Sequence, residues 1–295
     1  MLIPDSLSKQ DLPPECLYIV ASPIGNLGDL TLRAIHVLNQ MDGIACEDKR
    51  QSLLLLNHFS IHKPLLALHE HNEREGANEL IARLRQGERW AYLSDAGTPG
   101  ISDPGARLVM QVRSEGFRVI PIPGVSSVSS ALSIAGEVLL NGQGKFQFVG
   151  FLPTQKNELE KQLVSIIDSS LPTVFFESPH RIAKTLSRLG KLLTNDRQLL
   201  IARELTKKFE SITILNPNQF SEWLEDPNNQ KGEFVLILAG RNQETASQTS
   251  ADQAKLADLL KGYLGSKDLA FILHQMYGID KKAAYEMALI VKKGG

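Results

Sequence analysis

The sequence predicts an α/β protein with two sheet-bearing halves and a small helical domain at its C-terminal end. Between residues 16 and 135, short apolar runs alternate with amphipathic segments, as in βα units around a mainly parallel sheet. Between residues 146 and 238, the apolar runs stand closer together with fewer helices between them, which favours a mixed sheet. Between residues 252 and 293, apolar residues recur at helical spacing and predict three short helices.

Five strands and five helices are expected in the first half. Each strand is a short apolar run that ends in turn-forming or charged residues. The predicted strands are 17–21, 43–46, 64–68, 91–93 and 119–122. The predicted helices, whose apolar residues recur every three to four positions, are 31–41, 53–56, 74–86, 106–115 and 126–135.

The second half is expected to follow a turn-rich connection over 136–145. Its predicted strands are 146–151, 173–177, 198–203, 211–215 and 232–238, and its predicted helices are 155–167 and 182–193. Composition and patterning divide the chain into five parts. These are a flexible leader (1–15), an N-terminal α/β domain (16–125), a C-terminal α/β domain (126–240), a linker (241–251) and a helical tail domain (252–295).

Composition indicates a soluble globular protein. The chain has 295 residues, 42% of them hydrophobic and 22% charged, and a net charge of -1, so any nucleic-acid contact needs a local basic patch. Cys16 and Cys46 form no CxxC pair, so no metal site is predicted. Neither a signal-peptide core nor an apolar run of the ~20 residues that span a bilayer is found, and a reducing, cytoplasmic location is expected.

A polar loop follows each strand of the first half. In a parallel sheet these loops meet at one edge, where open α/β sheets bind ligands. The loops are PIGN (23–26), EDKR (47–50), HEHN (69–72), SDAGTP (94–99) and PGVSS (123–127). The segment 91–105, AYLSDAGTPGISDPG, is the most unusual, and by itself it fits either a stiff turn or a ligand-binding loop.

Several common catalytic motifs are missing from the sequence. No GxxxxGK[ST] phosphate loop, no GxGxxG after the first strand, no HExxH and no GxSxG is found. These absences argue against nucleotide hydrolysis, dinucleotide redox chemistry, zinc proteolysis and serine hydrolysis. Loops rich in Gly, Pro and Ser, with carboxylates beside them, suit a zwitterionic ligand that carries an adenine.

Seven motifs together resemble one family, the bacterial ribosomal RNA small subunit methyltransferase I family. It belongs to the tetrapyrrole-methylase-like (class III) group of S-adenosylmethionine enzymes. The resemblance covers about residues 16–240, and its motifs stand in the family's order. They are SPIGNLGDLTLRA (22–34), EDxR (47–50), HEHN (69–72), SDAGTP (94–99), ESPHR (177–181), ARELTK (202–207) and KGEF (231–234).

The resemblance implies a fold, an activity and a donor site. The fold would be two α/β domains of tetrapyrrole-methylase type with the donor cleft between them, in a homodimer. The activity would be S-adenosylmethionine-dependent 2′-O-methylation of a cytidine, expected to be nucleotide 1402, in the 16S rRNA of the small ribosomal subunit, where it would tune the decoding centre. The donor-binding residues implied by position are Pro23, Asp95, Ala96, Gly97, Thr98, Ile101, Ser126, Ser127 and Glu177.

Methyl transfer to a ribose hydroxyl calls for a proton acceptor, because a 2′-hydroxyl is a poor acid. The candidates are the carboxylates at strand ends, Glu47, Asp48, Glu70 and Glu204. The candidate RNA contacts are Arg50, His69, Asn72, Arg181 and Lys207. A purely structural interpretation stays open for each, since ion pairs and hydrogen-bonded histidines are common at loop corners.

Two other functions fit the same pattern. The wider group methylates small tetrapyrrole-like substrates, and a protein of this fold could bind RNA without turnover. The HEHN and ARELTK motifs and the helical tail favour RNA as the substrate, and the intact SDAGTP loop argues against a loss of turnover. The tail lysines (Lys281, Lys282, Lys292 and Lys293) fit either RNA phosphates or a solvated helix face.

Overall fold

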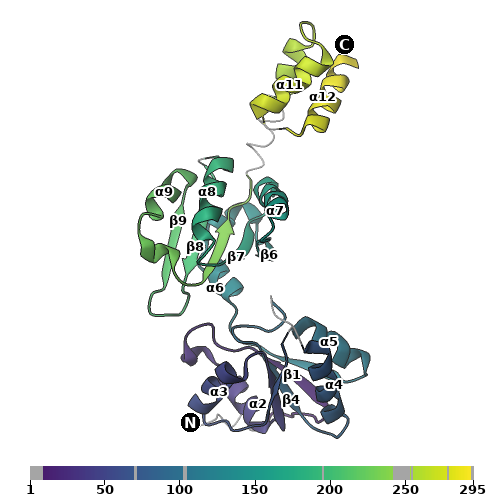
Figure 1. The fold of residues 1–295 in the computed structure, drawn as a ribbon, viewed down its shortest axis with the longest axis vertical. Coiled ribbons are helices and arrows are strands. Elements are labelled where there is room, and N and C mark those ends of the chain that lie inside the picture. The colour runs from purple at the N-terminus through teal and green to yellow at the C-terminus, as the bar shows by residue number, and fades with distance from the viewer. Residues whose placement is uncertain are drawn as a thin grey trace.

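The structure, a computed structural model, describes residues 9–69, 72–101, 105–194, 196–241, 253, 255–277 and 279–293. Within these residues the chain forms two five-stranded sheets with helices against them, followed by packed C-terminal helices (Figure 1). The predicted α/β class and the helical tail are thus confirmed.

The first sheet is parallel at every strand pair. Its strands are β1 (Cys16–Val20), β2 (Gly43–Cys46), β3 (Leu65–Ala67), β4 (Trp90–Leu93) and β5 (Arg118–Ile122). Their order in space is β3-β2-β4-β1-β5. All five predicted strands are present within two residues of their predicted ends, and their carboxyl ends share one edge. The prediction that five polar loops follow strands at one edge is confirmed.

Helices cover both faces of this sheet. α2 (Leu32–Gln40) and α3 (Lys49–His58) lie on one face, and α4 (Glu73–Leu84) and α5 (Gly105–Ser114) lie on the other. Successive β1 residues point to opposite faces, so Leu17 joins the core under α4 and α5, while Tyr18 joins the core under α2 and α3. This is the burial expected of a central parallel strand.

The predicted helix over 53–56 was too short. α3 begins at Lys49, directly after Asp48, whose side chain accepts a hydrogen bond from the Arg50 N–H at 2.7 Å. This N-cap satisfies a backbone donor that would otherwise be unpaired. The predicted residues 53–56 form the middle of this helix.

The second sheet is mixed, as predicted. Its strands are β6 (Gln147–Phe151), β7 (Thr173–Glu177), β8 (Leu199–Arg203), β9 (Ser211–Leu215) and β10 (Phe234–Leu238), in the order β6-β7-β10-β8-β9. Only the β6–β7 pair is parallel. The predicted helices are α7 (Lys156–Asp168) and α8 (Ile182–Leu192). The sequence did not predict α9 (Phe220–Trp223) or the 3-10 turns η1 (Leu27–Asp29), η3 (Pro217–Gln219) and η4 (Pro227–Gln230).

The small helix α6 (Ser127–Ser133) packs on the second sheet, although it directly follows the first. Val128 and Ala131 share a core with Ile237 of β10, and Ile24 from the loop after β1 joins the same core. The two halves are therefore packed together beside the loop edge. The predicted turn-rich segment 136–145 is in fact largely a 3-10 helix, η2 (Gly136–Gly142), because the buried Val138 anchors it to this core.

The C-terminal helices have a core of their own. α11 (Ser266–Tyr277) and α12 (Lys281–Lys293) pack against each other and against helical residues 255–260. Small side chains such as Ala270, Ala284 and Ala288 let these helices approach closely. No helix in the described part of the chain is long and apolar enough to span a membrane. The domain boundaries drawn from the sequence stay a prediction.

Candidate functional site

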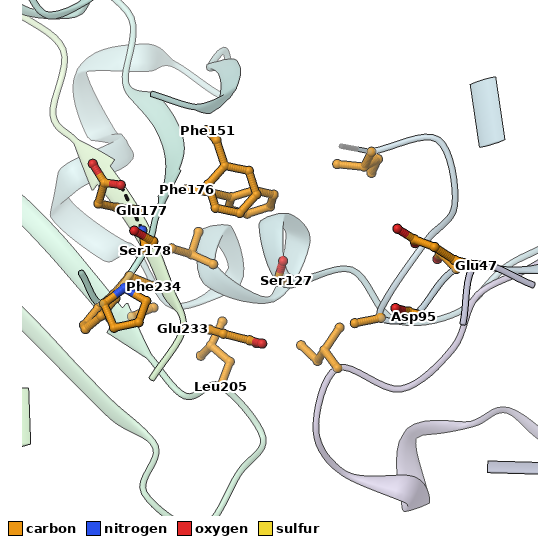
Figure 2. A pocket seen from close by; sticks show the side chains of 17 residues that line it. Glu47, Asp95, Ser127, Phe151, Phe176, Glu177, Ser178, Leu205, Glu233 and Phe234 are labelled. Carbon is orange, nitrogen blue, oxygen red and sulfur yellow. Dashed lines mark hydrogen bonds between the residues drawn. The ribbon is translucent and has the colours of Figure 1, made fainter. Parts of the chain in front are cut away.

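A cavity of about 360 Å³ lies between the loop edge of the first sheet and the second sheet. The first half contributes loops after β1, β2 and β4, and the second half contributes the ends of β6 and β7 and the start of β10 (Figure 2). Its volume is in the range of small-molecule sites. Residues from both halves line the cavity: Ile24, Glu47, Ser94, Asp95, Ala96, Ile101, Ser127, Phe151, Phe176, Glu177, Ser178, Pro179, Ala202, Leu205, Glu233, Phe234 and Val235.

The loop after β4 forms the wall on the side of the first sheet. Its Gly97 pairs with Ser22 through two backbone hydrogen bonds, and the Ser22 hydroxyl donates to the Ser94 carbonyl at 3.0 Å. The Thr98 hydroxyl donates to the Val125 carbonyl at 2.8 Å. These bonds tie the loop after β4 to the loops after β1 and β5. Gly97 and Thr98 thus hold the wall together without lining the cavity.

Asp95 is exposed on this wall and accepts a hydrogen bond from the Asp48 N–H at 3.1 Å. Partial burial raises the pKa of Asp95, the Asp48 N–H opposes that effect, and the nearby Asp48 charge raises the pKa further. Beside it, Glu47 lines the cavity from the loop after β2, and Figure 2 shows both side chains on the same side of the space. Two carboxylates therefore face the cavity together.

Aromatic side chains form the wall on the side of the second sheet. The rings of Phe151 and Phe176 are 5.2 Å apart between centroids and lie together on this wall (Figure 2), whereas Phe234 is 2% exposed and its ring packs in the core of the second half. Phe151 is 55% exposed, although it is large and apolar. The sequence reasoning missed these aromatic residues, since it examined the polar loops and not the ends of the second set of strands. An uncovered aromatic side chain suits a flat ligand ring.

Glu177 is buried at 2% exposure and belongs to the same wall. Its carboxylate accepts hydrogen bonds from the Ser178 N–H at 2.9 Å and the Thr185 hydroxyl at 2.6 Å. Arg181 approaches it to 3.4 Å and donates two more hydrogen bonds, to the carbonyls of Leu152 and Pro153. The guanidinium of Arg181, a candidate RNA contact, is therefore used within the protein, where it joins α8 to the end of β6.

Glu204, Lys207 and Glu233 form an ionic cluster beside the cavity. The Lys207 ammonium is 3.0 Å from a carboxylate oxygen of each glutamate, and the Glu233 N–H donates to Glu204 at 2.9 Å. Burial alone would raise the pKa of Glu204, but the Glu233 N–H and Lys207 outweigh it and lower the pKa. Burial likewise opposes protonation of Lys207, yet the two glutamates raise its pKa. Glu204 is thus a stabilised anion and a weak base.

A second cavity of about 390 Å³ adjoins the first. The two share Ile24, Ser94, Asp95, Ala96 and Glu233. The second cavity is also lined by the loop after β1, by one side of α3 and by Lys207. The loop after β1 meets the second half here, because a Cβ at Gly25 would collide with the Lys207 side chain.

The structure brings together some of the residues that the sequence singled out and separates others. Five of the nine donor-site candidates line the first cavity: Asp95, Ala96, Ile101, Ser127 and Glu177. Pro23 and Lys207 line the second. Ser126 precedes α6 and lines neither cavity. Among the proton-acceptor candidates, Glu47 lines the first cavity, Asp48 caps α3, and Glu70 lies outside the described residues.

The described residues of the HEHN motif, His69 and Asn72, lie away from the cavities. The motif follows β3, which is the edge strand of the first sheet. The Asn72 side chain accepts from the His69 N–H at 2.8 Å and donates to the Ala67 carbonyl at 3.0 Å. Asn72 therefore shapes the turn between β3 and α4. Arg50, by contrast, has a side chain that is 92% exposed at the start of α3.

Comparisons with known proteins agree with this architecture. Residues 16–217 match the family model for Tetrapyrrole (Corrin/Porphyrin) Methylases. The chain is 44% identical over 275 residues to the ribosomal RNA small subunit methyltransferase I of Haemophilus influenzae, covering 92% of this chain and 96% of that one. It is 39% identical, with the same coverage, to the protein of that name from Pseudomonas aeruginosa.

Solved structures of more distant proteins share the fold. A cobalt precorrin-4 methyltransferase superposes with a TM-score of 0.57 at 18% identity, covering 77% of this chain and 95% of that one. A uroporphyrin-III-C-methyltransferase from Thermus thermophilus superposes with a TM-score of 0.51 at 20% identity, covering 76% of this chain and 94% of that one. At this identity the likeness concerns the fold alone.

Proposed function

Because this chain belongs to the tetrapyrrole methylase family, and within it to the ribosomal RNA small subunit methyltransferase I family, we propose that it methylates 16S rRNA. In this proposal S-adenosylmethionine is the methyl donor, and the acceptor is the ribose 2′-hydroxyl of a cytidine in the small ribosomal subunit. The expected nucleotide is cytidine 1402. The donor would occupy the first cavity, between the two halves.

The acidic lining of the first cavity supports placing the donor there. Four lining residues are acidic (Glu47, Asp95, Glu177 and Glu233), of which Glu177 is paired with Arg181 and Glu233 with Lys207, and none of the residues that line the cavity is a lysine or arginine. A phosphate-bearing ligand would be repelled here, whereas a sulfonium with an amino group would be attracted. The exposed Phe151 ring on the opposite wall suits an adenine face. The residues present therefore fit the donor.

The transfer step needs alignment and one proton acceptor. Bound S-adenosylmethionine would supply the methyl group, and its sulfur would keep the electron pair of the broken carbon–sulfur bond; the protein would align the 2′-oxygen with the methyl carbon and accept the hydroxyl proton. We assign the base to Glu47, because it lines the cavity while Asp48 caps a helix and Glu204 is held as an anion by Lys207. Asp95 shares the wall and would orient the donor.

Transfer of tritium from labelled donor to purified small subunits, followed by mapping of the modified nucleotide, tests the proposal. We expect one label per subunit on a ribose 2′-oxygen, at a cytidine. Label on a base, or none on rRNA, would overturn the proposal. A parallel reaction with uroporphyrinogen III tests the chemistry of the wider family, and transfer to that substrate alone would assign a small-molecule activity instead.

We also propose that the protein acts as a cytoplasmic homodimer. Family resemblance supports the dimer, and the absence of an apolar spanning helix from the described residues is compatible with the location. Light scattering on the purified protein measures the assembly state directly. A mass of about 33 kDa, that of one chain, at micromolar concentration would contradict the dimer.

A further inference from the structure

The second cavity adjoins the first, which is the proposed donor site, and shares part of its wall. We propose that the second cavity receives the nucleoside that is methylated, flipped out of the RNA, with its base against α3. This inference deepens the proposed function and depends on it. The argument rests on the shared wall, on the side of α3 that faces the cavity, and on the chemistry of that side.

The shared wall places donor and acceptor in contact. Methyl transfer requires the accepting oxygen to lie within van der Waals contact of the methyl carbon, in line with the breaking bond. Asp95 and Ala96 line both cavities, and Glu47 lines the first beside them. Figure 2 shows Glu47 and Asp95 together at this wall. A ribose at the junction would meet the methyl group and the proposed base at once.

One side of α3 is buried. Ser52 and Leu56, four residues apart, are buried at 4% and 1% exposure. Gln51, Leu54, Leu55 and His58 recur at the helical spacing of three and four residues and line the second cavity together with Ser52, while Leu55 also packs against the core.

Leu54 is 75% exposed beside the second cavity, although it is a large apolar residue. It is not needed to fill the core, and water is an unfavourable environment for it. Leucine side chains form flat apolar surfaces against which a base can lie once it has left the stack. A nucleoside base in the second cavity would cover Leu54 and remove its apolar surface from water.

Gln51 supplies hydrogen-bonding groups to the second cavity. The Gln51 amide offers both a donor and an acceptor, which match the ring nitrogen and the exocyclic amine on the pairing edge of cytosine. Uracil presents the opposite pattern there, which the same amide meets after a half-turn, so Gln51 suits the pairing edge of either pyrimidine. Arg50, whose side chain is 92% exposed at the start of the same helix, supplies positive charge for a flanking phosphate, whereas the Lys207 ammonium is held by Glu204 and Glu233.

A matched pair of substitutions on α3 tests the inference. Leu54→Trp fills the second cavity, whereas Leu53→Trp makes the same change at the neighbouring exposed position, which does not line it. For Leu54→Trp we expect kcat/KM with small subunits to fall about 100-fold, with donor affinity by calorimetry unchanged within about threefold. Leu53→Trp should stay near wild type in both measurements.

Gln51→Leu tests the base contact separately. On small subunits we expect kcat/KM to fall at least about fivefold in this variant, with donor affinity unchanged, because the hydrogen bonds to the base are lost. If both Leu54→Trp and Gln51→Leu transferred methyl groups at the wild-type rate, on subunits that the wild-type enzyme methylates, the inference would be overturned. The proposed function would not be affected by that result. Failure of the wild-type enzyme itself on subunits would instead overturn both.

Discussion

At the scale of single residues, three carboxylates that occupy similar positions in the sequence have different partners in the structure. Glu47, Asp48 and Glu204 all directly follow or lie within a residue or two of a strand end. Glu47 lines the cavity, Asp48 caps α3, and Glu204 pairs with Lys207. Only the first position puts a carboxylate beside the proposed ligand. The role of each acid is thus set by neighbours that lie far away in the sequence.

Replacing Glu47 by glutamine removes the proposed base with little change in size. We expect the single-turnover rate on small subunits to fall by about 10²–10⁴-fold while donor affinity changes by less than about threefold. Asp48→Asn is the comparison, because asparagine also caps helices, and it should keep nearly full activity. A wild-type rate for Glu47→Gln would remove this residue from the mechanism.

Replacing Asp95 by asparagine tests the origin of its raised pKa. Burial raises the pKa of Asp95 in the folded state. The ionised carboxylate therefore lowers the free energy of unfolding at pH 7, and this loss is recovered as the pH falls through the raised pKa and the carboxylate is protonated. The asparagine side chain would be neutral and could still accept from the Asp48 N–H.

We therefore expect Asp95→Asn to raise the melting temperature at pH 7 by a small amount, under about 4 °C, because the side chain is exposed. The difference in melting temperature between the variant and the wild type should narrow as the pH approaches about 4, near the ordinary pKa of an aspartate. Donor affinity at pH 7 should fall, as measured by calorimetry. A lower melting temperature than wild type at pH 7 would contradict this account.

At the scale of elements, α3 connects the two cavities. Its N-cap Asp48 also donates its N–H to Asp95 on the loop after β4, so the start of the helix and the donor-side wall are held together. The helix packs in the core through Leu56 and lines the second cavity through Leu54. A change at the cap is therefore expected to affect both stability and RNA methylation.

Asp48→Ala should lower the free energy of unfolding by about 0.5–2 kcal/mol through loss of the cap. Because the first turn of α3 carries Gln51, KM for small subunits should also rise, while Asp48→Asn restores both properties. Urea denaturation and steady-state kinetics measure the two effects. Equal stability of the alanine and asparagine variants would show that the cap contributes nothing.

At the scale of the whole molecule, the first cavity exists only because the two halves meet. Phe151 and Phe234 come from the second sheet, and Glu47 and Asp95 come from the loop edge of the first. The close approach of Gly25 to Lys207 and the shared core around Ile24 hold these walls in place. A ligand between the walls should therefore stabilise both halves together.

S-adenosylhomocysteine at about 100 times its dissociation constant should stabilise the folded protein by about 2.7 kcal/mol. Hydrogen exchange should slow in both the loop after β4 and the end of β6, because the ligand touches both walls. ATP at the same concentration is the control, since its phosphates would be repelled by the acidic lining. Protection confined to one half would contradict a site shared by the two.

Most of the fold followed from local patterns. The predicted bounds of β2, β7 and β9 equal those in the structure, because a short apolar run bounded by turn residues favours a strand. The start of α3 and the helix η2 were missed, since a capping aspartate and a single buried valine give weak signals. The loop after β4 was recognised from its SDAGTP motif, whereas the aromatic residues on the opposite wall of the cavity were not predicted.

Local sequence patterns were enough to predict the two kinds of sheet, the shared edge of five loops and the resemblance to a methyltransferase family, because these depend on residues close together along the chain. The three-dimensional contacts were needed to learn that Glu47 faces the cavity, that Arg181 is used within the protein, and that α3 lines a second cavity. Each of these depends on a neighbour from another element. Side chains of the same type acquire different roles when folding places one at a helix cap or against a cation and another at the wall of a cavity.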